Sequence, residues 1–298
     1  MIAYRSLYSM GTRLEMVFPG LHEEMADAAF QKIRKTLNDE ENVLSIYLEN
    51  SEFALMNANA ADAPFSLKPD TFKLIQELLK YNKDTFGCFD PVLGITKSEV
   101  YNHPGEDISN LLEIKMEDRF ELDADELSIK FNSPFVKFDS GAFGKGYALE
   151  SIKKILLSFK IRDAFISFGD SSVMTLGKHP AGDHWKVGIR DFVDEEKNAW
   201  VFELNNGSVS TSGNTTWNQM KTEKGHLVDP LSGKKKQDKS VVSVMGDSAM
   251  VTEIISTALF VAGKDKRKLI LERFPQYTAV ELVYNEDKLT TEINVMNS

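Results

Sequence analysis

The chain has 298 residues, of which 42% are hydrophobic and 27% are charged, and its formal net charge is −10. This composition is typical of a globular protein, and the acidic excess argues against non-specific binding to nucleic acid or to anionic membranes. The one cysteine, Cys88, excludes an internal disulfide and a cysteine-based zinc site.

Hydrophobic periodicity predicts helices and strands in an irregular order along the chain. Helical spacing of apolar residues predicts helices over 21–44, 69–85, 145–160, 248–261 and 264–274. Mixed β-branched and aromatic segments predict strands over 3–18 (one or two strands), 127–131, 164–168, 185–189, 200–204, 240–244 and 278–284. Residues 102–117 are polar and contain Pro104-Gly105, which is typical of a surface connection.

The order of these elements favours an α+β fold with largely antiparallel sheets, because the strands come in runs. No linker rich in Pro, Gly or Ser divides the chain, so we expect residues 1–298 to form a single domain. No run of about 18 apolar residues suggests a membrane span. The first residues contain no apolar leader, so we expect a cytoplasmic protein without membrane insertion, unless an export segment preceded Met1.

A glycine-rich segment, FDSGAFGKGY at residues 138–147, leads into a predicted helix with Lys145 in its first turn. Glycines let the backbone approach a ligand closely, and free amides at a helix start attract phosphate. The segment is not a P-loop, because Gly146 stands where that motif requires Ser or Thr. It indicates either a phosphate-binding helix start or a glycine-rich helix entry with a solvated lysine.

His226 stands before an apolar pair and a DPLSG turn that ends at Gly233. An imidazole with a pKa near about 6.5 can act as a general base, although a histidine bonded to its own turn is an alternative. Ser212 lies in a hydroxyl-rich segment, residues 210–214, which we expect to form a turn. A hydrolase triad of Ser212, His226 and Asp229 is disfavoured, because the chain lacks a GxSxG elbow.

Glu253 and Thr257 are four residues apart in a predicted helix, so they share one face. A carboxylate and a hydroxyl are hard oxygen ligands suited to Mg²⁺. The alternative is an exposed Glu253 and a Thr257 bonded to its own helix. Cys88 follows a predicted helix in the turn FGCFDP and has no local base, so we expect a small core or loop-lining residue rather than a nucleophile.

Together and in this order, the segments resemble the ApbE family of Mg²⁺-dependent FAD:protein FMN transferases, from residue 10 to about residue 263. The resemblance implies an α+β fold with FAD in a cleft between sheets. It also implies transfer of FMN from FAD to a Ser or Thr hydroxyl of a target flavoprotein, with release of AMP. The similar motifs are MGT at 10–12, SIY, SE and N within 45–57, GCFDP at 87–91, DSGAFGKGY at 139–147, ISFG at 166–169, TSG at 211–213, HLVDPLSG at 226–233 and TEIISTAL at 252–259.

The resemblance also implies roles for individual residues. Tyr47 would stack on the isoalloxazine ring, and His226 would take the proton from the acceptor hydroxyl. Mg²⁺ would be held by Glu253, Thr257 and the backbone carbonyl of Ala142. The implied contacts with FAD come from Met10, Tyr47, Asp90, Lys145, Gly169, Asp170, Ser212 and His226.

Three features depart from the family pattern. Glu253 stands where the family usually has Asp, and Asp170 replaces the second glycine of the NLGG element. The leader peptide and lipid-anchor cysteine common in exported members are not found. The first two departures leave open a chain that binds FAD but transfers slowly or not at all. The alternatives to a transferase are an FAD pyrophosphatase that forms FMN and AMP, and a non-catalytic FAD-binding protein.

Overall fold

The computed structural model describes residues 2–92, 114–194, 196–213, 229–230, 236, 239–285, 288 and 290–296. Its main element is an antiparallel sheet in the order β1-β2-β6-β7-β10-β11-β12-β13. The strands are β1 (Ile2–Ser9), β2 (Thr12–Pro19), β6 (Ala164–Phe168), β7 (Ser172–Leu176), β10 (Ser208–Gly213), β11 (Ser240–Gly246), β12 (Thr278–Asn285) and β13 (Thr290–Met296). The predicted α+β class with largely antiparallel sheets is confirmed.

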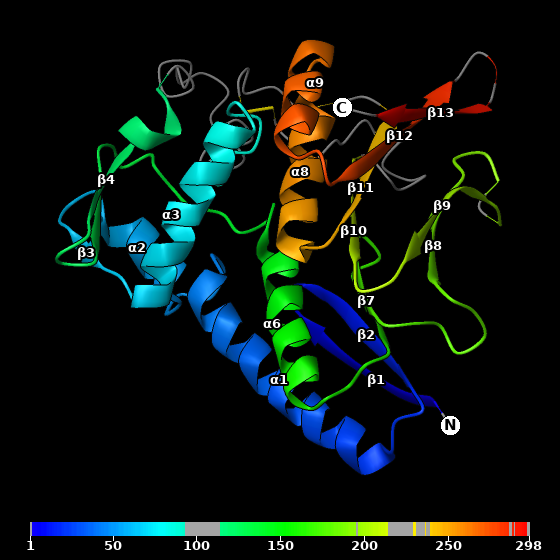
Figure 1. Cartoon of the computed structure of the whole chain (residues 1–298). Helices are drawn as coiled ribbons and strands as arrows, with labels where there is room; N and C mark the ends of the chain where they lie inside the picture. Colours follow the sequence, from blue (N-terminus) through cyan, green and yellow to red (C-terminus); the bar gives the residue numbers. More distant parts are fainter. Residues whose placement is uncertain are drawn as a thin grey trace.

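Helices pack against this sheet, and two smaller sheets complete the fold (Figure 1). The smaller sheets are β3-β5-β4, from β3 (Phe65–Ser66), β4 (Phe120–Asp123) and β5 (Ser128–Phe131), and the pair β8 (Trp185–Arg190) with β9 (Asn198–Leu204). The helices are α1 (Glu23–Leu44), α2 (Glu52–Asn59), α3 (Pro69–Asp84), the short 3₁₀ helix η1 (Met116–Asp118), α6 (Gly144–Ser158), α8 (Ala249–Val261) and α9 (Lys264–Arg273).

The core contains one helix that is buried on all sides and another that is buried along one face. Helix α8 is buried along nearly its whole length and lies against β10 and β11, as expected for a helix that is apolar on all sides. Helix α1 is amphipathic: Ala26, Ala29, Ile33 and Leu37 are buried at helical spacing against α6 and β1, while most of its charged side chains face solvent. Helix α6 lies between these two and contacts both.

The predicted helices are confirmed to within about two residues at each end, and so are the predicted strands and the antiparallel pairing of β8 with β9. The predicted turn at residues 210–214 is wrong, because residues 208–213 form β10, a strand between β7 and β11. This strand is rich in small hydroxyl side chains that hydrogen-bond to neighbours rather than in large apolar ones. Helix α2 and the strands β3, β4, β7 and β13 were not predicted, and most of the expected connection at 102–117 lies outside the described residues.

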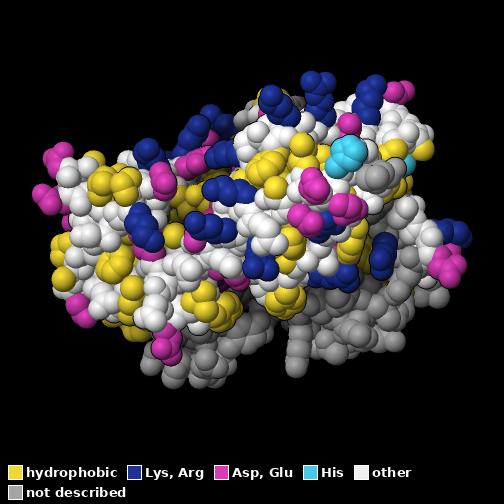
Figure 2. Space-filling view, turned by 90° about the horizontal axis from the view of Figure 1, so that it is seen from below, with side chains coloured by type: hydrophobic (Ala, Val, Ile, Leu, Met, Phe, Trp, Pro, Cys, Tyr) yellow, Lys and Arg dark blue, Asp and Glu magenta, His cyan; other side chains and the backbone are white. Residues whose placement is uncertain are grey.

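The surface carries charges of both signs, although the formal net charge is −10. On the face shown in Figure 2, Lys and Arg side chains lie among acidic and apolar ones across the middle of the molecule. Locally positive sites are therefore compatible with an acidic chain. Within the described ranges, no helix has both the length and the hydropathy needed to cross a bilayer.

Candidate active site

The N-termini of α6 and α8 meet near the centre of the molecule (Figure 1). Each helix donates an amide from its first turn to a glutamate on the other helix. The N–H of Gly146 donates to Oε2 of Glu253, and the N–H of Ala249 donates to Oε1 of Glu150 at 2.6 Å. Because the N-terminus of a helix is the positive end of its dipole, two positive ends converge at this junction.

Gly146 lets the two helices approach this closely. A Cβ atom at this position would lie 2.4 Å from the carbonyl oxygen of Ala249 and 2.6 Å from Cα of Met250. Both are backbone atoms that no side-chain rotation can move. The close contact between the two helices therefore requires glycine at position 146. This is the same residue whose presence after Lys145 excluded a P-loop.

Lys145 and Glu253 form an ion pair at this junction. The distance from Nζ of Lys145 to Oε1 of Glu253 is 2.6 Å, and the side chains are 23% and 4% exposed. A carboxylate buried to this extent needs hydrogen-bonding partners, and Glu253 has the ammonium group on one oxygen and the Gly146 amide on the other. The alternative of an exposed Glu253 is wrong.

A cluster of hydroxyl groups lies between β10 and α8, beside this pair. Ser212 Oγ is 2.8 Å from Ser256 Oγ and 3.0 Å from Thr257 Oγ1, and Ser256 also donates to the carbonyl of Glu253. The structure thus brings two predicted site residues, Ser212 and Thr257, into direct contact. Ser256 was missed, although a serine three residues after Glu253 in an apolar helix is a signal for a buried polar face.

Two hairpin turns that carry predicted site residues lie side by side. Met10 and Gly11 both have positive φ angles, 48° and 73°, as a two-residue turn between β1 and β2 requires. Gly169 donates its N–H to the carbonyl of Arg13, and a Cβ on Gly169 would lie 2.7 Å from the Thr12 side chain. The predicted residues Met10, Gly169 and Asp170 therefore come from two adjacent turns.

The Met10 turn is tied to α1, and α1 leads to Tyr47. Glu41 on α1 accepts the N–H of Met10 at 2.6 Å, a contact that no sequence motif indicated. The Tyr47 side chain is 88% exposed in the loop after α1, so its ring is available for stacking. The Ser140 hydroxyl donates to the carbonyl of Leu44 at 3.0 Å, which joins this loop to the segment that carries Ala142 and Lys145.

Asp90 is buried in an ion pair with Arg119, at 2.8 Å between Oδ2 and Nη1. Burial raises the pKa of Asp90, while the Arg119 charge acts in the opposite direction. The neighbouring carbonyl of Pro91 accepts the N–H of Asp139 at 2.7 Å, so the turn braces the start of the glycine-rich segment. A direct contact between Asp90 and FAD stays a prediction. Arg119 was not identified from the sequence.

Cys88 lies in the same turn and is buried, and burial raises the pKa of its thiol to about 11. The thiol is therefore protonated at neutral pH and is a poor nucleophile. The prediction of a small core residue is confirmed. His226, the predicted base, lies outside the described residues.

The residues predicted to hold Mg²⁺ offer oxygen donors only. Glu253 and Thr257 lie on α8, and Ala142 precedes the first turn of α6, which contacts α8 through Gly146. Across the described residues, no group of three or more His, Cys, Asp or Glu side chains could hold a metal ion. A carboxylate, a hydroxyl and a backbone carbonyl fit a hard cation, and one of the carboxylate oxygens is bonded to Lys145.

An α+β fold with two helix N-termini at a polar junction, bordered by hairpin turns, defines a class of protein in which loops from several elements surround one site. The sequence model of the ApbE family matches residues 10–281, and the chain therefore belongs to the ApbE family. The resemblance found in the sequence is confirmed.

Curated relatives and solved structures agree with this assignment. FAD:protein FMN transferase from Chlamydia muridarum is 28% identical, over 70% of this chain and 68% of the relative. FAD:protein FMN transferase from Treponema pallidum is 26% identical, over 85% of this chain and 76% of the relative. The structure of flavin transferase ApbE from Vibrio cholerae covers 99% of this chain and 97% of its own, with a TM-score of 0.81 at 18% identity. The flavinyl transferase ApbE from Pseudomonas stutzeri covers 99% and 94%, with a TM-score of 0.82 at 21% identity.

Proposed function

We propose that this chain transfers FMN from FAD to a Ser or Thr hydroxyl of an acceptor flavoprotein and releases AMP, with Mg²⁺ as its metal ion. Membership of the ApbE family and the names of its relatives support this reaction. The single observation that carries the proposal is the meeting of two helix N-termini beside Lys145.

The junction suits a pyrophosphate for two reasons. The two helix dipoles both present their positive ends here, and the Lys145 ammonium is partly exposed. The amides of Gly146 and Ala249 and the ammonium of Lys145 are bonded to Glu253 and Glu150 in this structure, so a pyrophosphate would have to share these donors. Binding of the FAD pyrophosphate here therefore needs no net positive charge on the protein. Tyr47 would contribute an aromatic face for the flavin, with Met10 near one end of the site.

The oxygen donors of Glu253, Thr257 and Ala142 would hold Mg²⁺, which would supply positive charge to the pyrophosphate as it is cleaved. Glu253 is longer than the aspartate usual in the family, and in this structure it reaches both Lys145 and the Gly146 amide. Lys145 would have to share or release Oε1 when the cation binds. The expected consequence is competition between the ammonium group and the metal ion for Glu253.

The chemistry needs a base near the acceptor hydroxyl. We assign this role to His226: its imidazole takes the hydroxyl proton, the hydroxyl oxygen forms a bond to the phosphorus of the FMN moiety, and the pyrophosphate P–O bond breaks so that AMP leaves. Ser212, whose hydroxyl is bonded to Ser256 and Thr257, would contact the ligand rather than attack it.

The test is incubation with FAD and Mg²⁺, with and without a candidate acceptor. Release of AMP together with a fluorescent flavin band on the acceptor supports the transfer reaction. AMP without acceptor labelling would instead indicate an FAD pyrophosphatase, and bound FAD without any AMP would indicate a non-catalytic flavin-binding protein. His226→Ala should keep FAD binding and lose transfer, whereas His184→Ala, an exposed control, should change neither.

A further inference from the structure

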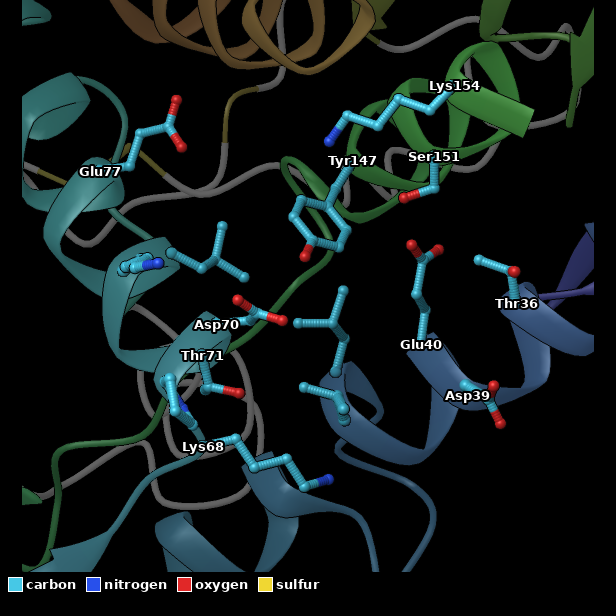
Figure 3. A pocket seen from close by; sticks show the side chains of 15 residues that line it. Thr36, Asp39, Glu40, Lys68, Asp70, Thr71, Glu77, Tyr147, Ser151 and Lys154 are labelled. Carbon is cyan, nitrogen blue, oxygen red and sulfur yellow. The ribbon is translucent and has the colours of Figure 1, made fainter. Parts of the chain in front are cut away.

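A cavity of about 730 Å³ lies between α1, α3 and α6 (Figure 3). On α6 it is lined by Tyr147, Ser151 and Lys154, which share a helix face at spacings of four and three residues. None of the residues assigned above to FAD or Mg²⁺ lines it. The cavity is therefore distinct from the helix junction, although both use α6.

Glu40 places a carboxylate with one unsatisfied oxygen in this cavity. Its side chain points toward Ser151 and Tyr147 (Figure 3), and its Oε2 atom is buried without a hydrogen-bond partner among the described residues. Burial raises the pKa of Glu40, with a smaller contribution in the same direction from the Asp39 charge, while a hydrogen bond to Ser151 and the charge of Lys154 lower it; the net result is a pKa of about 7. A buried oxygen of this kind lacks a donor, and a bound cation would supply one.

Further negative charge comes from α3 on the opposite wall. Asp70 points toward the hydroxyl of Tyr147 in Figure 3, and Glu77 lies about two turns further along α3. Burial raises the pKa of Tyr147, and the charges of Glu40, Asp70 and Glu77 raise it further. Carboxylates on α1 and on α3 therefore both place negative charge near the Tyr147 side chain.

The other residues that line the cavity indicate whether it suits a cationic or an anionic ligand. Val43, Leu44 and Leu74 give the cavity an apolar wall between the two acidic sides. The other charged residues of the lining, lysines and acids alike, are exposed, and Lys68 is paired with Glu52 outside the cavity at 3.4 Å, so Glu40 is the partly buried charge of the lining. The unsatisfied buried group is thus an acceptor, which favours a ligand with positive charge and a short hydrocarbon chain.

We propose that this cavity binds an aliphatic diamine. One ammonium group would donate to Glu40, the other would lie toward Asp70 and Glu77, and the methylene chain would pack against Val43 and Leu74. The two charges of the ligand then match carboxylates on opposite walls, and the orphaned Glu40 oxygen gains its donor.

The test is calorimetric titration of the full chain, without FAD, with 1,4-diaminobutane, 1-aminobutane and inorganic phosphate at pH 8. We expect the diamine to bind at least about tenfold more tightly than the monoamine, because it satisfies both acidic walls. We expect weaker diamine binding at pH 6, where Glu40 becomes protonated and loses its charge. Neither outcome depends on flavin transfer, so failure of the proposed function would leave this test intact.

Variants make the proposal specific. Glu40→Gln should weaken diamine binding at least about tenfold, since the neutral amide keeps the shape and removes the charge. Glu24→Gln makes the same chemical change at an exposed position of α1 outside the cavity and should leave binding unchanged, and Lys154→Met should tighten it by removing a competing cation. Absence of diamine binding at about 10 mM, equal binding by Glu40→Gln in a folded protein, or binding of phosphate in preference to the diamine would overturn the proposal.

Discussion

Helix α6 lies between two carboxylates that differ in their hydrogen-bonding partners. At its N-terminus, Glu253 is almost fully buried, but an ammonium group and a backbone amide bond to its two oxygens. Along its other face, Glu40 is less buried as a residue, yet one of its oxygens has no partner within the described chain and its pKa rises to about 7. The two sites therefore differ in the hydrogen-bonding partners they give a carboxylate, and they suit different ligands.

The largest expected effect comes from Gly146→Ala, which pushes the two helices of the junction apart. The added methyl group would meet backbone atoms of α8 at 2.4 and 2.6 Å, so we expect destabilisation of about 3 kcal/mol and loss of FAD binding. Urea unfolding and FAD titration measure both. Gly182→Ala is the control, because no atom lies within 4 Å of its added Cβ. Equal stability of the two variants would contradict the close helix contact.

The ion pair at the junction gives the next largest effect. Lys145→Met leaves the buried Glu253 charge without its ammonium partner and should cost about 3 kcal/mol, and Glu253→Gln should cost about 1–3 kcal/mol. The double variant should lose less than the sum, because each single change already breaks the pair. Additive losses in urea unfolding would show that the two side chains do not interact.

Glu40 should make stability depend on pH in the opposite sense to a paired carboxylate. Its pKa is raised from 4.5 to about 7, so the folded protein holds a proton that the unfolded chain has released. The free energy of unfolding should therefore fall by about 2–3 kcal/mol from this group as the pH rises from about 4.5 to about 7, and stay level above. Glu40→Gln should remove this slope, whereas the exposed Glu24→Gln should retain it. A slope unchanged by Glu40→Gln would contradict the burial of an uncompensated carboxylate.

Tyr47 should have the smallest effect on stability and a selective effect on flavin. Because its side chain is 88% exposed, Tyr47→Ala should change the free energy of unfolding by less than about 0.5 kcal/mol. FAD affinity should fall about tenfold if the ring stacks on the flavin. Leu48→Ala, an exposed neighbour, should leave the affinity unchanged, and an equal loss in both variants would argue for a loop effect instead.

Local patterns predicted most of the elements, because long amphipathic helices such as α1 and α3 carry their own periodicity. They failed at β10, whose serines and threonines hydrogen-bond to β11 and α8 from distant parts of the sequence. The same limit applies to the site. Glycines and Lys145 marked the start of α6, and the spacing of Glu253 and Thr257 marked one face of α8. The roles of Glu41, Arg119 and Glu150 depend on tertiary contacts over tens of residues, which no local pattern contains.

The unpartnered oxygen of Glu40 likewise could not be predicted from the sequence. Its position in α1 follows from helical periodicity, but its burial depends on α3 and α6 packing around it. The cavity could therefore be recognised only once the three helices were placed.

The most direct test of the helix junction is binding of FAD and of riboflavin, which lacks the pyrophosphate, to the wild-type chain and to Lys145→Gln. Glutamine can still hydrogen-bond to Glu253 but carries no charge. We predict that Lys145→Gln weakens FAD binding at least about tenfold and leaves riboflavin binding unchanged, because only the pyrophosphate meets the junction. Unchanged FAD affinity, or an equal loss for both ligands, would contradict a pyrophosphate site at the meeting point of α6 and α8.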